Sequence, residues 1–377
     1  MIDLLRQEVM AAAGSVVVKI GTSVLAAPDG TLDREQVAHL SDQFAALKRG
    51  GRQVVVVSSG AIGAGMGKLK LGRRPVDLPA LQAAAAVGQC SLMDAYDEHL
   101  GRHGYAAAQI LLTAEDFNHR ERYLNVRNTI LQLLAWNAVP IINENDTVSV
   151  SEIRFGDNDQ LAAMVTNLLR APLLVILSVA AGLYPGDPNL DPSLKPIPLV
   201  LSIDEKTSGY AGATKSALGS GGMQSKLQAV RLATAAGESV CIASGREPNV
   251  LTRLLAGEEI GTLFPATGES LTSWKRWIGM TAKPRGAYVV DAGAKAALID
   301  KGRSLLPVGV AAVRGEFAPG EVVSIEHPAG VEFARGLTNY SAAEAGRLCG
   351  RTTDQLAQLL PGSRYEEVVH RDNLVLL

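Results

Sequence analysis

Two lysines and one aspartate, far apart in the chain, stand where charged side chains could act on a phosphoryl group. Lys19 ends an apolar run, Asp159 precedes an apolar helical pattern, and Lys226 follows a glycine cluster. Phosphoryl transfer asks a protein mainly for positive charges held in fixed positions. A carboxylate can keep two ammonium groups in register, or contact a metal bound to a nucleotide. We therefore take Lys19, Asp159 and Lys226 as candidate catalytic residues.

The glycine cluster before Lys226 is typical of a loop that leads into a helix. Backbone N–H groups at a helix start lack partners, and the helix dipole favours anions there. The alternative is a flexible surface connection, because glycine clusters mark turns more often than phosphate sites. The candidate phosphate-binding loop consists of Ser220, Gly221, Gly222, Met223, Gln224, Ser225 and Lys226.

Other polar or small residues directly follow apolar strands. They are Lys19-Ile20-Gly21, Ser58-Ser59-Gly60 and Asn143-Glu144-Asn145-Asp146. Continuous apolar strands that alternate with helices predict a parallel α/β sheet covered on both faces, with ligands bound beyond the carboxyl ends of the strands. Each segment alone could be a turn, and Asp157 or Asn158 could only cap a helix. Because all of these segments are expected at one edge of the sheet, we favour a ligand-binding site there.

Two common nucleotide motifs and a protein-bound metal are not indicated. The nearest approach to a Walker A sequence, Gly67-Lys68, continues with Leu69 where Ser or Thr is needed. No GxGxxG follows a strand with an acid at the right distance, so a Rossmann site is disfavoured. His99 and His103 have metal-ligand spacing, but the glycines beside them indicate a helix C-terminus.

Composition places the chain among ordinary globular proteins. Of its 377 residues, 47% are hydrophobic and 20% are charged. The net charge of −2 gives no overall positive field that would indicate binding to nucleic acid or to an anionic membrane. Its three cysteines form no CxxC pair, which favours a reduced compartment. We find no run of about 20 apolar residues and nothing like a signal peptide at the N-terminus. We therefore expect a cytoplasmic protein without a membrane segment.

The sequence predicts two domains joined by a linker. Residues 1–264 form the α/β domain, with Ser239–Ala243 as its last strand, and 265–283 form the linker. Because large aromatic side chains are seldom left wet, we expect Trp274 and Trp277 in the linker to pack the domains together. Residues 284–363 form a small, mostly β domain, and 364–377 form a C-terminal tail.

Several motifs resemble those of one family. They are Val18-Lys19-Ile20-Gly21-Thr22-Ser23, Ser59-Gly60-Ala61-Ile62, Ile142-Asn143-Glu144-Asn145-Asp146, Gly156-Asp157-Asn158-Asp159, Gly182-Leu183-Tyr184 and Gly221-Gly222-Met223. Through them the chain resembles the glutamate 5-kinases of the amino-acid kinase family over nearly its whole length. The C-terminal domain resembles a PUA domain.

The resemblance implies an αβα sandwich and a particular reaction. Members use ATP, with Mg2+ bound through its phosphates, to phosphorylate the side-chain carboxylate of L-glutamate in the first step of proline synthesis. The resemblance further implies inhibition by L-proline at or near the glutamate site, and a homo-oligomer, either a dimer or a tetramer. Another carboxylate or carbamate kinase of the same fold is the alternative.

Roles carry over by position from this resemblance. Lys19 and Lys226 would neutralise charge on the transferred phosphoryl group, and Asp159 would organise them. The residues expected to hold glutamate are Ser59, Gly60, Asp146 and Asn158. The residues expected to contact ATP are Lys19, Gly21, Ser178, Val179 and the loop Ser220, Gly221, Gly222, Met223, Gln224, Ser225 and Lys226.

Two positions depart from the family pattern. Ser178-Val179 stands where relatives typically carry Thr-Asp, and Gln224-Ser225 stands where Ser-Thr is expected. Because the candidate catalytic residues are retained, we expect altered nucleotide affinity or specificity and not an inactive enzyme.

The PUA-like domain raises a different class of function, an RNA-binding regulator with a vestigial kinase domain. Between Pro284 and Leu360 there are eight Lys or Arg and eight Asp or Glu, so the net charge is zero. RNA-binding surfaces normally show a basic excess. We therefore do not expect RNA binding, and favour a regulatory or assembly role for this domain.

Overall fold

The computed structural model describes residues 2–149, 158–188, 190–210, 222–266, 275, 277–352, 355–356, 359 and 365–377. The chain divides into two compact units. The first comprises Met1–Asp116 and Glu121–Ser270, and the second comprises Phe117–Arg120 and Leu271–Leu377. Each unit has its own sheet and its own core.

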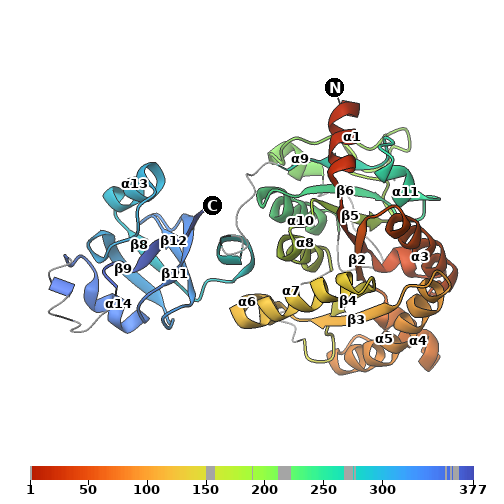
Figure 1. The fold of residues 1–377 in the computed structure, drawn as a ribbon, viewed down its shortest axis with the longest axis horizontal. Coiled ribbons are helices and arrows are strands. Elements are labelled where there is room, and N and C mark those ends of the chain that lie inside the picture. The colour runs from red at the N-terminus through yellow and green to blue at the C-terminus, as the bar shows by residue number, and fades with distance from the viewer. Residues whose placement is uncertain are drawn as a thin grey trace. The chain divides into compact units, whose positions relative to one another are not determined.

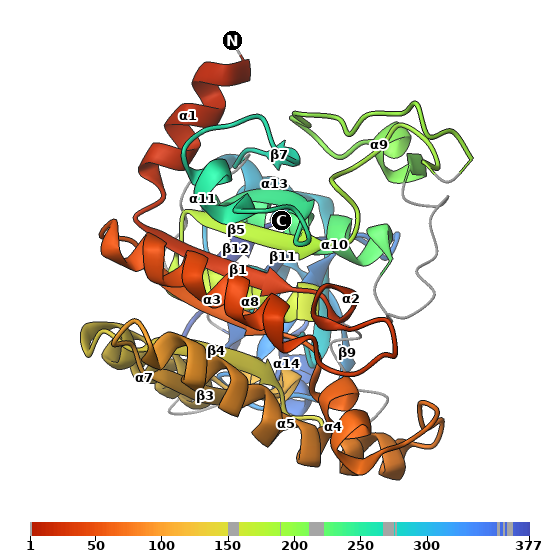
Figure 2. The same ribbon diagram turned by 90° about the vertical axis from the view of Figure 1, so that its right-hand side faces the viewer.

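The sheet of the first unit has seven strands within the described residues, in the order β3-β4-β2-β1-β5-β6-β7. Figure 2 shows β3 and β4 toward one edge of this sheet, β1 and β5 between, and β7 at the other edge. The strands are β1 (Ser15–Ile20), β2 (Gln53–Ser58), β3 (Ala107–Leu112), β4 (Val139–Glu144), β5 (Leu173–Ser178), β6 (Ser239–Ser244) and β7 (Thr262–Phe264). Strands β1 to β6 are parallel, so their carboxyl ends meet at one edge. The predicted parallel αβα sandwich is confirmed.

One detail of this sheet was predicted wrongly. Residues 239–243 do not form the last strand, because β7 adds an antiparallel edge beside β6, with Cys241 opposite Leu263. Three residues are too few to show a strand period in the sequence, so the pairing comes from the returning chain and not from local pattern.

Helices cover both faces of this sheet (Figure 1). The helices of this part of the chain are α1 (Ile2–Ala12), α2 (Thr22–Leu25), α3 (Arg34–Arg49), α4 (Ala61–Leu69), α5 (Leu78–Gly101), α6 (Ala114–Asn118), α7 (Arg120–Ala135), α8 (Asn158–Leu169), α9 (Glu205–Tyr210), α10 (Met223–Ala235) and α11 (Val250–Leu255). Helices α3, α5 and α11 share a core with alternate strand residues such as Val16 and Val18. Helices α8 and α10 lie on the other face (Figure 1).

Helices α4 and α5 pack with their backbones in close approach. A Cβ atom added at Gly88 would overlap the carbonyl oxygen of Ala61, and one added at Gly65 would overlap that of Ala84. These neighbours are backbone atoms, which cannot move aside as a flexible side chain can. The two glycines therefore fix the separation of the helices, and α4 begins directly after the candidate site residue Gly60.

Replacement of Gly88 by alanine is expected to force α5 away from α4 and lower the free energy of unfolding by about 3 kcal/mol. Gly101, the last residue of the same helix, has open space around it. Gly101→Ala is the matched control and is expected to change stability by less than about 1 kcal/mol. Urea unfolding of both variants checks this. A Gly88→Ala protein as stable as Gly101→Ala would contradict the packing.

The second unit contains a five-stranded sheet in the order β12-β11-β10-β8-β9 within its described residues. Its elements are β8 (Gly286–Val290), α13 (Ala292–Lys301), β9 (Val310–Gly315), β10 (Val322–Glu326), β11 (Glu332–Thr338), α14 (Ala342–Leu348) and β12 (Val369–Leu376), with a π-helix at Trp277–Thr281 and a 3-10 turn at Pro307–Gly309. Tyr288, Val323 and Val369 lie in its core. The expected small, mostly β domain is confirmed.

One expectation about this unit was wrong, and another stays untested. Residues 364–377, expected as a tail, contain β12, which pairs antiparallel with β11, so the sheet extends past the boundary set at 363. Trp274 lies outside the described residues. Trp277 is buried within the second unit, where its indole N–H donates to the carbonyl oxygen of Phe117 at 2.8 Å. The packing of tryptophans between domains stays a prediction.

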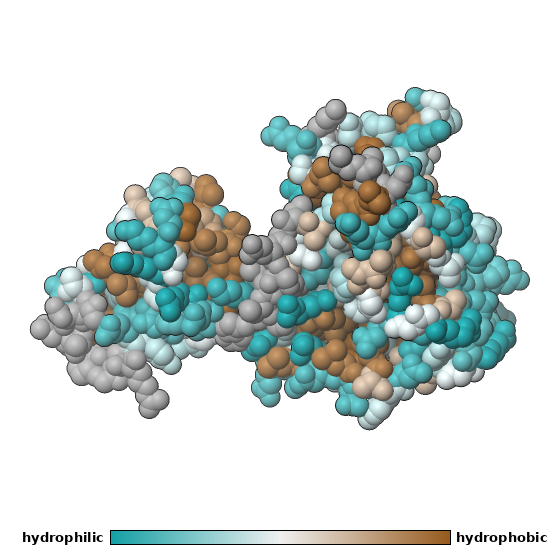
Figure 3. Space-filling model, turned by 45° about the horizontal axis from the view of Figure 1, so that its top comes forward, coloured by the Kyte–Doolittle hydropathy of each residue, from teal (hydrophilic) through white to brown (hydrophobic). Residues whose placement is uncertain are grey.

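None of the helices in the described part of the chain is both long and apolar enough to span a bilayer. On the face drawn in Figure 3, hydrophobic side chains form separate areas among hydrophilic ones. Exposed large hydrophobic residues include Val76, Trp136 and Leu190, which lie far apart in the chain. Scattered apolar side chains of this kind are normal on protein surfaces.

Candidate active site

The structure brings Lys19, Asp159 and Lys226 into direct contact. Lys19 Nζ lies 2.5 Å from Asp159 Oδ1, and Lys226 Nζ lies 3.0 Å from Asp159 Oδ2. One carboxylate therefore holds two ammonium groups, one on each oxygen. All three side chains are buried, and Asp159 is 0% exposed. The two cations and one anion leave one positive charge in excess, which suits an anionic ligand.

Three different elements deliver these side chains. Alternation along β1 places Val18 and Ile20 in the core beneath α3, so Lys19 faces α8 on the opposite side. Asp159 is in the first turn of α8, and Lys226 is in the first turn of α10. Helices α8 and α10 pack together, and the contact of Lys226 with Asp159 shows that their first turns lie side by side. Both helix dipoles add positive potential there.

The charge state of Asp159 follows from its neighbours. Burial by itself raises the pKa of this carboxyl group, but the charges of Lys19 and Lys226 outweigh burial and lower the pKa to about 2. Asp159 is therefore ionised at neutral pH. A buried carboxylate between two lysines fixes both ammonium groups in position before any ligand arrives.

The candidate phosphate-binding loop is described in part. Ser220 and Gly221 lie outside the described residues. Gly222 is the N-cap of α10, Met223 begins the helix, and Gln224 is exposed. The hydroxyl of Ser225 lies 3.1 Å from both Asp159 Oδ2 and the carbonyl oxygen of Gly222, and donates to one of them at a time. Ser225 thus joins the cluster around Asp159.

A second, uncharged cluster surrounds Asn158, the residue before Asp159. Its side-chain Nδ2 lies 2.9 Å from the carbonyl oxygen of Ser58, 3.0 Å from Ser59 Oγ and 2.8 Å from Asn143 Oδ1. These contacts join the ends of β2 and β4 to the start of α8. Asn158 is therefore held at the carboxyl edge of the sheet, immediately beside the charged cluster.

The remaining predicted residues lie at the same edge. Gly60 has φ of +107°, a left-handed conformation that favours glycine, and caps α4. Asp146 lies in the turn after β4, and the N–H of Gly21 donates to Leu177 O at 3.0 Å. At the end of β5, Ser178 accepts from the N–H of Gly245 at 2.8 Å through its carbonyl oxygen.

Val179, the residue that replaces an expected aspartate, has a side chain that is 56% exposed directly after β5. Exposed apolar side chains contribute no hydrogen bond to a nucleotide. The structure thus places an exposed hydrophobic side chain where the resemblance led us to expect a carboxylate, and nothing in the contacts of Val179 explains the exchange.

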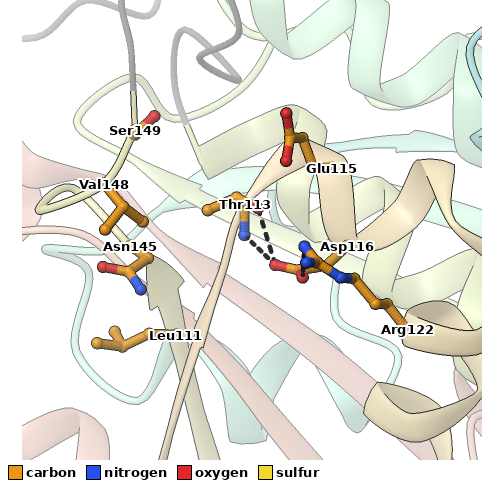
Figure 4. A pocket seen from close by; sticks show the side chains of 8 residues that line it. All are labelled: Leu111, Thr113, Glu115, Asp116, Arg122, Asn145, Val148 and Ser149. Carbon is orange, nitrogen blue, oxygen red and sulfur yellow. Dashed lines mark hydrogen bonds and ion pairs between the residues drawn. The ribbon is translucent and has the colours of Figure 1, made fainter.

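A pocket of about 470 Å³ opens beside the turn that holds Asp146 (Figure 4). It is lined by Leu111, Thr113, Glu115, Asp116, Arg122, Asn145, Val148 and Ser149. Asp116 accepts from the N–H and the hydroxyl of Thr113 at 2.7 and 2.9 Å and lies 3.4 Å from Arg122, so it is already engaged. Glu115 and Arg122 place opposite charges on one side, facing Asn145 and Val148 in Figure 4.

Two residues behind the site were not identified from the sequence. Gln89 and Tyr96, both on α5, contact Asn143 and Ser58 at 2.9 Å. Burial raises the pKa of Tyr96, so its phenol stays protonated. The available signal is that Gln89, Leu92 and Tyr96 fall at i, i+3 and i+7, on one buried helix face. Two polar residues on such a face indicate polar partners.

Comparison with known proteins agrees with this geometry. The model of the amino acid kinase family matches residues 14–244, and the PUA domain model matches residues 286–360. A glutamate 5-kinase from Trichlorobacter lovleyi is 47% identical over 96% of this chain and 96% of its own. One from Cupriavidus metallidurans is 46% identical over 98% and 100%, and one from Methylococcus capsulatus is 48% identical over 96% and 96%.

The match to the amino acid kinase family defines the class, a phosphotransferase, and the parallel αβα sandwich with two buried ammonium groups at its carboxyl edge agrees with it. The chain belongs to the amino acid kinase family and, within it, to the glutamate 5-kinases.

Proposed function

We propose that this chain transfers a phosphoryl group from ATP to the side-chain carboxylate of L-glutamate, giving an acyl phosphate for proline synthesis. The relatives described above are glutamate 5-kinases, which supports glutamate as the acceptor. The observation that carries the reaction type is the contact of Asp159 with both Lys19 and Lys226. We place the enzyme in the cytoplasm, as a homo-oligomer.

The charged cluster fits the phosphates of a nucleotide. Bound MgATP would supply the phosphoryl group, its Mg2+ held through the phosphates. Lys19 and Lys226 then neutralise the charge that spreads over the equatorial oxygens, and Asp159 keeps both ammonium groups in place so that they need no reorganisation. The loop from Ser220 to Lys226 contacts the nucleotide, and Val179 alters its affinity.

The uncharged cluster fits the acceptor. Asn158, Ser59, Gly60 and Asp146 hold glutamate, with its side-chain carboxylate turned toward the lysines. Asp146 carries a negative charge suited to the ammonium group of an amino acid. Proline, as an inhibitor, competes at or near these residues. The pocket beside the turn that holds Asp146 supports this placement, because it offers space for a small ligand lined by polar side chains such as Thr113, Asn145 and Ser149.

Trapping with hydroxylamine tests the proposed reaction. An acyl phosphate reacts with hydroxylamine to give a hydroxamate, so we expect hydroxamate to form with glutamate, in step with ADP release. Aspartate, N-acetylglutamate and carbamate are the comparison acceptors and should give at most a few per cent of that rate. ADP release without glutamate-dependent hydroxamate would reject the acceptor, and salt-sensitive RNA binding without kinase activity would favour the regulator.

A further inference from the structure

Gln89 occupies an unusual position behind the uncharged cluster. It lies on α5, its side chain is 8% exposed, and its Oε1 accepts from Asn143 Nδ2 at 2.9 Å. Its own Nε2 is buried, and no acceptor lies within hydrogen-bonding distance among the residues that the structure describes. A buried N–H group without a partner costs free energy. The contact with Asn143 therefore holds the Gln89 amide with its oxygen toward Asn143, even though its NH2 group is left unpaired.

The backbone of β4 fixes the direction in which the Asn143 amide points. Asn143 Oδ1 accepts from the N–H of Glu144 at 2.9 Å and from Asn158 Nδ2 at 2.8 Å. If the Asn143 amide were flipped, its NH2 group would face two other donors. The strand thus leaves Asn143 with its NH2 group toward α5, and only an acceptor at position 89 satisfies it.

The series of hydrogen-bonded side chains continues from Asn143 through Asn158 to Ser59. Asn158 Nδ2 has two hydrogens and three acceptors around it, one of which is Ser59 Oγ at 3.0 Å. When Ser59 accepts from Asn158, its own hydroxyl hydrogen points elsewhere. In the described part of the chain, no protein acceptor takes that hydrogen. It is free to be donated to a carboxylate.

We propose that Gln89 is a positioning residue for the acceptor substrate, acting through Asn143 and Asn158 on the hydroxyl of Ser59. The proposal rests on the function proposed above, in which Ser59 and Asn158 help to hold glutamate. Gln89 itself does not touch the substrate. Its oxygen accepts from the NH2 group that the strand turns toward α5, so the amides of Asn143 and Asn158 stay in place and the hydroxyl of Ser59 faces the carboxylate.

Loss of the Gln89 oxygen is expected to impair the use of glutamate and to leave the binding of ATP unchanged. In Gln89→Met the buried NH2 group of Asn143 loses its acceptor, while the N–H of Glu144 still contacts its oxygen. We expect the Asn143 amide to shift to relieve the unpaired donor, and Asn158 and Ser59 to lose their fixed positions with it. We expect kcat/KM for glutamate to fall about 10- to 50-fold. The KM for ATP should stay within about twofold, because Gln89 has no contact with Lys19, Asp159 or Lys226.

Two further variants separate positioning from general packing. In Gln89→Glu a carboxyl oxygen still accepts from Asn143 and the unpaired N–H is gone, so kcat/KM should return to within about threefold of the parent. Gln43 is the matched control: it is 6% exposed, and its Oε1 accepts from the N–H of Leu251 at 2.9 Å, on the far helix α3. Gln43→Met should lower stability without changing kcat/KM.

The experiment measures kcat/KM for glutamate and KM for ATP in all three variants, with rates referred to the folded fraction from thermal melts. Gln89→Ala, which removes the oxygen without adding bulk, serves if Gln89→Met does not fold. A Gln89→Met enzyme that loses no more kcat/KM than Gln43→Met, or a Gln89→Glu enzyme that is not restored, overturns the proposal. If the parent protein forms no glutamate-dependent hydroxamate, the proposed function fails instead.

Discussion

Replacement of Lys226 by alanine is expected to lower kcat at least a hundredfold while the fold stays intact. Lys226 supplies one of two ammonium groups that meet at Asp159, and a preorganised charge of this kind contributes on the order of 3 kcal/mol to the transition state. Asp159 keeps its contact with Lys19 at 2.5 Å in the variant, so no carboxylate is left without a cation. Steady-state kinetics and circular dichroism check both parts.

Two variants control for the loss of side-chain volume. Lys226→Met keeps most of the length of the side chain and loses the charge, so it should be as slow as Lys226→Ala. Lys48 is a half-buried lysine on α3 that lies over the ring of Tyr105, away from the site. Lys48→Ala should keep nearly normal turnover. Near-normal turnover of Lys226→Met would mean that this ammonium group does not act on the transferred group.

Replacement of Asp159 by asparagine is expected to abolish turnover and to lower the free energy of unfolding by about 3–5 kcal/mol. The variant leaves two buried ammonium groups facing each other without an anion, and breaking one side of a buried ion pair costs about this much. Asp42, on α3, has a side chain that is 62% exposed and contacts only His103 as an ion pair among the described residues. Asp42→Asn should cost less than about 1 kcal/mol.

The stability supplied by Asp159 depends on pH in a defined direction. Its pKa is lowered from 3.8 to about 2, so the stabilisation is fully present above pH 3.8 and is lost as the pH falls toward 2. Urea unfolding of the parent and of Asp159→Asn should therefore differ most at neutral pH, and the difference should shrink below pH 4. A difference that is constant from pH 7 to pH 3 would contradict the ionised state of Asp159.

Much of the first unit follows from local sequence. Runs of valine such as Val54–Val57 are long enough and apolar enough to indicate strands buried on both faces, and they predict the parallel sheet. Lys19, Asp159 and Lys226 stand out because each charge sits next to an apolar element. The topology then brings them together, since parallel strands share one carboxyl edge.

Other features depend on contacts that no local pattern reveals. Strand β7 has only three residues, and β12 carries His370 to Asn373 in its middle, so neither shows a regular period. The spacing of Gln89 with Leu92 and Tyr96 indicates a polar partner, but only the fold shows that this partner is Asn143. The part of the nucleotide loop at Ser220 and Gly221 lies outside the described residues.

The central claim is that Lys19 and Lys226 act on one transferring phosphoryl group and that Asp159 holds them there. A crystal structure with ADP, Mg2+, glutamate and aluminium fluoride, which imitates that group, tests it most directly. We predict both Nζ atoms within about 3 Å of the fluoride ligands, with Asp159 still between the two lysines. A fluoride complex bound away from either lysine, or one that forms with Asp159 turned out of the site, would contradict the account.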